Sequence, residues 1–216
     1  MRWINLRHDL VDAIRSASTH GLVVATEGNV SARIVEDASY LVAMTPTAIP
    51  YQQMTSADIV IVDHQGNSIE GFREPTSEMA LHLEAYRARP DVKAAMHTHP
   101  VYATVLGLLG KEIPLILDEL IPLVGGTVPI STYALSGTQD LANNARVALG
   151  EKQAVLLPHH GLLAVGSSLR DALEVSLAVE KACQVFAIAS MLGVPEAIPA
   201  SALNKALEFF QQRNTM

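Results

Sequence analysis

The sequence predicts an α/β sandwich in a single domain, and three observations support that prediction. Its 216 residues are enough to bury one good core. Hydrophobic residues make up 49% and charged residues 17%, which is typical of a packed domain or an oligomer subunit and not of a disordered chain. Short β-prone runs alternate with helical patterns, and no repeat or linker divides them. We therefore expect one domain over residues 1–216, with a core at about 4–193 and a tail at 195–216.

The N-terminal half is predicted to begin with a helix over residues 4–20, whose apolar positions recur mostly at helical spacing before Gly21 stops it. Residues 22–25 form a short β-prone run. Residues 31–35 and 40–44 indicate two strands joined by an acidic turn, and residues 59–62 indicate another strand. Helical periodicity returns over residues 77–89 and ends at Pro90.

The C-terminal half continues the alternation. Residues 92–99 have extended character, and a helix is expected to start at Pro100, where the missing N–H costs nothing. Further strands are predicted at 128–130 and 154–157, with a helix over 137–149 between them. Ser167 and Ser168 are good N-caps for a long apolar helix over 169–192, which Gly193 ends. Such a helix must be covered on more than one face, by the sheet and by a neighbouring subunit.

Charge and composition exclude several classes of protein. The net charge is −7, and the Lys and Arg residues are scattered, which argues against a nucleic-acid binder. The single cysteine, Cys183, excludes a disulfide framework, lies in an apolar stretch and is expected to be a buried thiol. The N-terminus does not read as a signal peptide, and no apolar run reaches the roughly 20 residues of a membrane span. We expect a soluble cytoplasmic protein without a membrane partner.

Two histidines lie two residues apart in the extended stretch, at positions 97 and 99. On a strand such residues point to the same face, so His97 and His99 would project together and can share one metal ion. Zinc binds neutral imidazole readily, and catalytic zinc sites use three protein ligands and leave one position open. The pair alone fits equally a partly exposed strand with two polar residues on its solvent side.

A third histidine favours the metal site. His159 and His160 stand between the apolar runs 154–157 and 162–165, next to a glycine that permits a tight turn. A buried histidine needs a partner, and a metal ion is one. From this chemistry alone either histidine can be the ligand. The remaining histidines are predicted to be solvated on surface helices or turns: His8, His20, His64 and His82.

Five separated motifs give the chain a resemblance to the class II aldolase/adducin family, most of all to its fuculose-phosphate aldolases. They are TEGNVSAR at 26–33, TPTAIPY at 45–51, PTSE at 75–78, HTH at 97–99 and HG at 160–161. They occur in the family's order and at matching intervals, and the resemblance extends from about residue 8 to residue 193. Any one motif alone would be a weak signal.

The resemblance implies a central, mainly antiparallel sheet within an αβα sandwich and a C4 homotetramer with active sites at subunit interfaces. It implies a zinc-dependent aldolase that cleaves or forms a C–C bond in a ketose 1-phosphate. The implied zinc ligands are His97, His99 and His160, which selects His160 over His159. Glu78 matches the catalytic carboxylate that also approaches the metal. The positions that match the family's phosphate-binding residues are Asn29, Thr47, Thr76 and Ser77.

General chemistry agrees with these roles. Three neutral histidines leave the full charge on zinc, which can then act as a Lewis acid and stabilise an enediolate. Glu78 would move the proton to and from the enediolate carbon, although a glutamate in the first turn of a helix is also favoured by the helix dipole alone. Thr76 and Ser77 at the same helix N-terminus suit a phosphate group, and one of them can also cap the helix.

Two departures from the family pattern leave the reaction open. Ala48 stands where the family has glycine in the second motif, which weakens the phosphate site if positive φ is needed there. The family's acidic tyrosine has no counterpart in Leu117-Asp118-Glu119-Leu120, and the nearest aromatic residue is Tyr133. Glu119 is a candidate replacement acid, as in the methylthioribulose-phosphate dehydratase branch, or an ordinary surface carboxylate. That branch has cysteine at the position of Glu78, whereas this chain keeps the aldolase residue.

Three functions are therefore compared. The leading one is aldol cleavage of a small-molecule sugar phosphate. A decarboxylase, epimerase or dehydratase would use the same metal site. An adducin-type interaction module, which keeps the fold and loses the metal ligands, is disfavoured because all three histidines are present.

Overall fold

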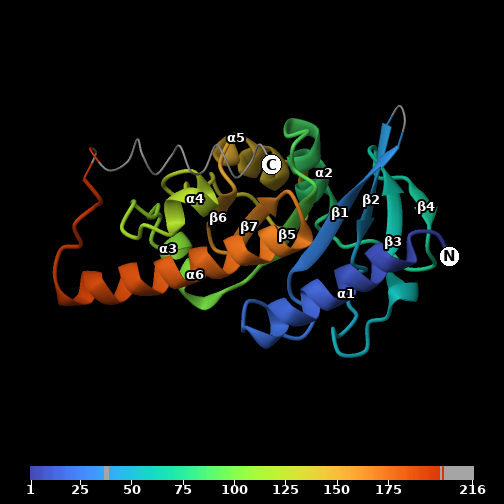
Figure 1. Ribbon diagram of the computed structural model, residues 1–216, viewed down its shortest axis with the longest axis horizontal. Helices are drawn as coiled ribbons and strands as arrows, with labels where there is room; N and C mark the ends of the chain where they lie inside the picture. Colours follow the sequence, from blue (N-terminus) through green and yellow to red (C-terminus); the bar gives the residue numbers. More distant parts are fainter. Residues whose placement is uncertain (37–38, 200, 202–216) are drawn as a thin grey trace.

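A seven-stranded antiparallel sheet forms the centre of the protein, in the strand order β4-β3-β2-β1-β5-β7-β6. The computed structural model describes residues 1–36, 39–199 and 201 (Figure 1). The strands are β1 (Asn29–Glu36), β2 (Ser39–Met44), β3 (Val60–Asp63), β4 (Ser68–Glu70), β5 (Ala94–Thr98), β6 (Ala154–Leu157) and β7 (Gly161–Gly166). The predicted mainly antiparallel sheet is confirmed.

Helices cover both faces of this sheet, so the αβα sandwich is confirmed as well. One face packs against α1 (Ile4–Thr19), α3 (Val101–Leu108), α4 (Leu120–Val124) and α6 (Leu169–Leu192). The other face packs against α2 (Met79–Ala88) and α5 (Gln139–Leu149). A 3-10 turn, η1 (Ser56–Asp58), lies near α1. Figure 1 shows α1 and α6 running along one side of the sheet, with α2 and α5 behind it.

Strand β1 shows how the sequence assigns its two faces. Val30, Ala32 and Ile34 point into the core under α1, because alternate residues of a strand lie on one face. The residues between them face α2 instead, and Asn29 and Ser31 are buried there although they are polar. Strands β5 and β7 continue the pattern, since their faces divide between the same two helix layers. The polar face of β1 therefore lies on the α2 side of the sheet.

Several predicted elements differ from those in the structure. Residues 22–25 form no strand, and residues 128–130 contribute only isolated bridges, from Val128 to Ile113 and from Ile130 to Leu156. Apolar side chains in these runs are buried by irregular backbone, so burial alone produced a strand-like pattern. The short elements β4, η1 and α4 were not predicted, because each is too short to show a period.

The burial of helix α6 changes along its length. Residues 169–183 bury side chains against the sheet and α3, including Val175, Val179 and Cys183, and the expected burial of Cys183 is confirmed. Its last turns are exposed, with Met191 85% and Leu192 86% accessible. Within the described residues α6 is long and apolar enough to cross a membrane by length and composition alone, against the prediction. Core helices of soluble proteins pass the same test, and α6 serves here as a layer of the sandwich.

The predicted C-terminal tail contains two adjacent aromatic residues, Phe209 and Phe210, which its sequence suggests as a cover for a site or a subunit contact. Both residues lie outside the described part of the chain.

Candidate metal and active site

His97 occupies the middle of the sheet. It lies on β5, opposite Asn29 of β1 on one side and Leu163 of β7 on the other. Its side chain is fully buried, and its Nδ1 lies 2.9 Å from the carbonyl oxygen of Leu162. A carbonyl only accepts, so Nδ1 carries the proton and the lone pair is left on Nε2. The sheet thus fixes both the position and the tautomer of this imidazole.

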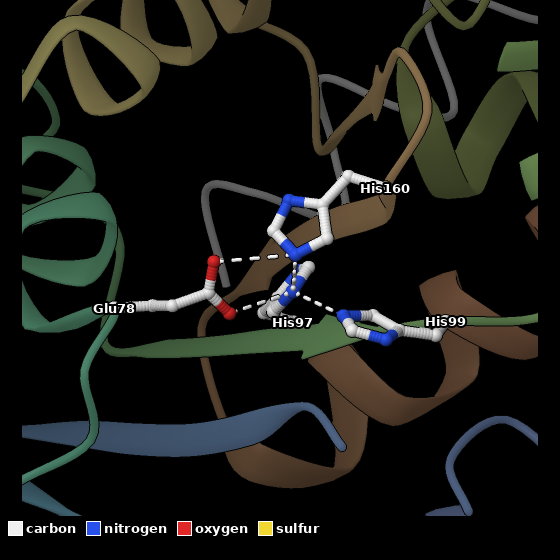
Figure 2. A group of neighbouring side chains, drawn as sticks. All are labelled: Glu78, His97, His99 and His160. Carbon is white, nitrogen blue, oxygen red and sulfur yellow. Dashed lines mark hydrogen bonds and ion pairs between the residues drawn. The ribbon is translucent and has the colours of Figure 1, made fainter. Parts of the chain in front are cut away.

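The other two predicted ligands converge on the same nitrogen. His99 follows β5 and places its Nε2 2.7 Å from Nε2 of His97. His160 comes from the turn between β6 and β7 and places its Nε2 3.2 Å from Nε2 of His97 (Figure 2). His159, one residue earlier, is exposed, and its ring lies against Tyr133. The geometry therefore brings His160 into the cluster and leaves His159 outside.

Glu78 completes the cluster from α2, the helix that covers this face of the sheet. It is the N-cap residue of α2, and its carboxylate oxygens lie 2.9 Å from Nε2 of His97 and 3.3 Å from Nε2 of His160 (Figure 2). One donor atom from each of the four residues lies within 4.8 Å of all the others. Three imidazole nitrogens and a carboxylate are a donor set that suits zinc and related transition metals. The residues therefore fit a divalent metal ion.

The surroundings set the charges of these groups. Burial and the neighbouring His97 lower the pKa of His99 to about 3, and the same causes lower the pKa of His160 to about 4. Both rings are therefore neutral at pH 7, which is the form that binds a metal. Burial acts to raise the pKa of Glu78, but His97, His160 and the amide of Asn29 outweigh it and hold that pKa well below its usual range. Glu78 is a carboxylate.

Two glycines allow the backbone to close around His97. A Cβ on Gly28 would lie 2.6 Å from the carbonyl oxygen of His97, and Gly28 has a φ of +77°. A Cβ on Gly161 would lie 2.2 Å from the carbonyl oxygen of Thr98. Tyr51 stabilises the turn at Gly28, because its hydroxyl donates to the carbonyls of Glu27 and Gly28. At both motif positions a side chain would collide with neighbouring backbone, which explains why glycine occurs there.

The four predicted phosphate-binding residues lie together beside the cluster of Glu78 and the three histidines, which we call the metal cluster. Asn29, Thr47, Thr76 and Ser77 line one pocket of about 160 Å³, together with Glu78 and two of the histidines. Their two loops are joined by hydrogen bonds from Thr76 N–H to the carbonyl of Thr45, 3.1 Å, and from Thr47 N–H to that of Glu74, 3.1 Å. The N-terminus of α2 begins at the same pocket, and the positive end of its dipole favours an anion.

Ala48, in the same pocket, has a φ of +57°. This is the left-handed region that the sequence argument associated with glycine, and a non-glycine residue there costs roughly 1–2 kcal/mol. The loop nevertheless keeps its place in the pocket lining. The alanine is accommodated at an energetic cost.

Two residues of the site were not found from the sequence. Ser136 lies in the loop before α5, and its hydroxyl donates to Glu78 Oε1 at 3.0 Å. No local pattern marks it, because it reaches the site only through the tertiary fold. His82 was expected to be solvated, and that prediction is wrong: it is 0% exposed and lies 2.5 Å from Asn29 Oδ1. Its position four residues after Glu78 on one helix face could have placed it.

Glu119 is not brought into the cluster within one protomer. It is exposed at the start of α4 and forms an ion pair of 2.7 Å with Lys181. A larger hollow of about 540 Å³ lies elsewhere, between α1 and the start of α6, and holds none of the residues of the metal cluster. Glu78 and two of the clustered histidines thus line the smaller pocket.

Comparisons with known proteins give the same family. The family described as Class II Aldolase and Adducin N-terminal domain matches residues 8–187. The 5-methylthioribulose-1-phosphate/5-deoxyribulose-1-phosphate aldolase of Rhodospirillum rubrum is 35% identical, over 96% of this chain and 92% of its own. The L-fuculose phosphate aldolase of Escherichia coli is 34% identical, over 90% and 87%.

Solved structures agree. A structure described as L-fuculose 1-phosphate aldolase has a TM-score of 0.91 and 33% identity, covering 96% of both chains. These relatives are named aldolases, which are lyases, and they match nearly the whole chain. With its motifs, antiparallel sandwich and His/Glu cluster, this chain belongs to the class II aldolase/adducin family.

Proposed function

We propose that the protein is a zinc-dependent aldolase that cleaves and forms a C–C bond in a ketose 1-phosphate. The observation that carries this proposal is the position of the metal cluster beside the anion pocket. Glu78 belongs to both, since it is one of the four metal-binding side chains and also lines the pocket. A phosphate in the pocket would therefore place the carbon atoms of its sugar next to the metal and the carboxylate.

The metal would supply Lewis acidity for the negative charge that develops on the substrate when the C–C bond breaks. Glu78 would hold and move the proton at the carbon atom that loses its bond. Two features support this role: the carboxylate is ionised and therefore ready to accept a proton, and Ser136 and Asn29 each hold one of its oxygens. Such contacts keep a proton-transfer group at a defined place.

Asn29, Thr47, Thr76 and Ser77 would hold the phosphate. The amide of Asn29 and the hydroxyls of the other three residues are all hydrogen-bond donors, as a phosphate requires, and the positive end of the α2 dipole favours an anion there. The pocket is small, so the rest of the sugar would extend over His99 and His160 toward solvent.

The relatives define the substrates to be compared. The Rhodospirillum enzyme is named for 5-methylthioribulose 1-phosphate and 5-deoxyribulose 1-phosphate, and the Escherichia enzyme for L-fuculose phosphate. All are ketose phosphates that differ beyond the bond to be cleaved. Within this class we propose a soluble cytoplasmic enzyme of sugar metabolism that acts as a homotetramer with interfacial active sites.

A screen of these phosphorylated ketoses, together with phosphorylated sugar acids, tests the proposed reaction. Metal-loaded protein should release an aldehyde and dihydroxyacetone phosphate from at least one ketose 1-phosphate. Release of carbon dioxide, an epimer or a dehydrated product without aldehyde would replace the aldolase by one of the other reactions of this metal site.

Replacing Glu78 tests its role separately. Glu78→Gln should bind the metal but lose solvent proton exchange at the reacting carbon of dihydroxyacetone phosphate by about 100-fold or more, the range of a general base. Glu119→Gln is the companion variant, since Glu119 is an exposed carboxylate paired with Lys181. If Glu119 is the second acid, as the sequence suggested, its replacement should slow cleavage and leave proton exchange intact. Proton exchange that survives in Glu78→Gln would remove Glu78 from the mechanism.

A further inference from the structure

A buried polar seam runs between β1 and α2, away from the pocket. Glu78, His82 and Tyr86 are four residues apart and share one face of α2. Asn29 and Ser31 are two residues apart and share the face of β1 that looks at this helix. His82 and Ser31 are 0% exposed, and Tyr86 is 1% exposed. Polar groups buried to this degree need partners, and they find them in one another.

The spacing of every fourth residue along α2 nearly equals the spacing of every second residue along β1. Four helical residues advance by about 6 Å, and two strand residues advance by roughly 6.6–6.8 Å. Each step along α2 therefore meets the next inward residue of β1. The contacts confirm this: Glu78 lies 3.2 Å from Asn29, and His82 lies between Asn29, at 2.5 Å, and Ser31, at 2.7 Å. Tyr86 follows, 2.8 Å from Ser31.

The charge on Glu78 fixes the direction of every hydrogen bond in the seam. A carboxylate only accepts, so Asn29 must turn its NH2 group toward Glu78 and its oxygen toward His82. That oxygen needs a donor, so His82 carries its proton on Nε2. A buried neutral ring then has a bare Nδ1, which accepts from the hydroxyl of Ser31. Ser31 in turn accepts from Tyr86.

The outer end of the seam is consistent with that order. The Tyr86 hydroxyl lies 2.8 Å from that of Ser31, and as a neutral phenol it can donate its proton to Ser31. Burial, the largest effect, raises the pKa of Tyr86, which remains a neutral donor. Burial likewise lowers the pKa of His82 to about 3, which keeps the ring neutral.

We propose that His82, supported by Ser31 and Tyr86, is a positioning residue that keeps the amide of Asn29 turned with its NH2 group toward Glu78 and the anion pocket. The reversed amide would set an oxygen against the carboxylate and an NH2 group against the Nε2–H of His82. One amide hydrogen is donated to Glu78, and the other remains for an anion in the pocket that Asn29 lines. His82 thus acts on the pocket without touching its ligand.

This inference rests on the proposed function only in taking the anion to be a phosphate. Inorganic phosphate is therefore the probe, and no sugar substrate is needed. Binding is measured by calorimetry on metal-loaded protein for the wild type, His82→Gln and His82→Leu, after equal metal content has been confirmed. Gln can place an N–H near the position of Nε2, whereas Leu fills a similar space without any donor.

The expected result is a phosphate Kd within about threefold of the wild type for Gln and about tenfold weaker for Leu, the size of one lost hydrogen bond. Ketose-phosphate kinetics should show the same order in KM, with a smaller change in kcat. Equal phosphate binding in Leu and the wild type, or equal losses in Leu and Gln, would overturn the proposal.

A second measurement uses the unaltered protein and does not depend on how the variants fold. Nitrogen-15 spectra of the histidines in the zinc-loaded wild type, with His82 assigned through its contact with Ser31, should show a proton on Nε2 and a bare Nδ1. A proton on Nδ1 would reject the seam even if phosphate binds. The expected seam in a protein that cleaves no ketose phosphate would reject the proposed function and leave this inference standing.

Discussion

Neighbouring histidines in this chain have opposite environments. His159 is exposed with a φ of +58°, while His160 turns inward, and its Nε2 is one of the four clustered donor atoms. The turn between β6 and β7 makes this difference, because successive residues on it point in different directions. Chemistry alone could not choose between the two rings, whereas the resemblance to the family selected His160, the ring that the fold brings into the cluster.

This difference gives a matched test of the metal site. His160→Ala should lose most of the bound metal, because it removes one of three imidazoles, whereas His159→Asn should retain it, since asparagine tolerates a positive φ. Metal content of the purified proteins by elemental analysis gives the answer. Equal metal in wild type and His160→Ala would mean that the ligand set is wrong.

The buried His82 also predicts a dependence of stability on pH. Its pKa is about 3 in the folded protein because of burial, and near 6.5 when unfolded. Between these values only the unfolded chain binds the proton, so this residue lowers the free energy of unfolding as pH falls below about 6.5 and has no such effect above it.

Urea unfolding of metal-stripped wild type and His82→Gln at pH 7.5 and 5.0 measures this effect. The wild type should lose about 2 kcal/mol more than the variant over that interval, at 1.36 kcal/mol per pKa unit. Identical losses in the two proteins would show that the ring is protonated or solvated in the folded state.

At the scale of elements, the site depends on how closely three central strands approach each other. Strand β5 lies between β1 and β7 and carries His97, with Gly28 and Gly161 at the ends of the neighbouring strands. The sequence predicted the strand and the shared face of His97 and His99 from a period of two. It did not reveal that both glycines lie against the backbone of residues 97–98, because a close approach between strands leaves no local pattern.

Gly161→Ala tests this approach. The new Cβ would meet the Thr98 carbonyl, so the backbone must shift, at a cost of about 1–3 kcal/mol, and metal affinity should fall with it. Gly193→Ala is the control, since nothing lies within 4 Å of its Cβ position and its φ of 171° is ordinary extended backbone. Thermal unfolding and metal titration of both variants test whether Gly161 is needed for this close approach. A normal melting temperature and normal metal affinity for Gly161→Ala would contradict the steric argument.

At the scale of the whole molecule, two helices that pack together carry many exposed apolar side chains. They lie on α3 and its C-cap and on the end of α6: Val101, Val105, Leu108, Leu109, Val185, Ile188, Met191 and Leu192. In addition, the buried Nδ1 of His160 has no hydrogen-bond partner among the residues that the structure describes. A metal-binding histidine normally donates this N–H, so another copy of the chain is a natural source of the acceptor.

These features support the predicted tetramer with interfacial sites. Light scattering after gel filtration should give about four times the mass of one chain. The double change Met191→Glu and Leu192→Glu should lower that mass, because it places charges in an apolar contact. Val147→Glu is the control, on an exposed position of α5 across the sheet. A monomeric wild type, or a double variant with unchanged mass, would reject this interface.

The sequence by itself determined the family and most of the order of the elements, and it predicted the three histidines that the fold brings together, because periodicity and short motifs are local properties that survive without the fold. It also gave the four pocket residues, through motifs that the fold brings together. Only the tertiary structure decided that Ser136 and His82 belong to the site and that Glu119 lies outside it within one protomer. The reason is physical: burial and hydrogen bonding between distant segments depend on how a strand and a helix pack, and His82 is hidden only once α2 lies on β1.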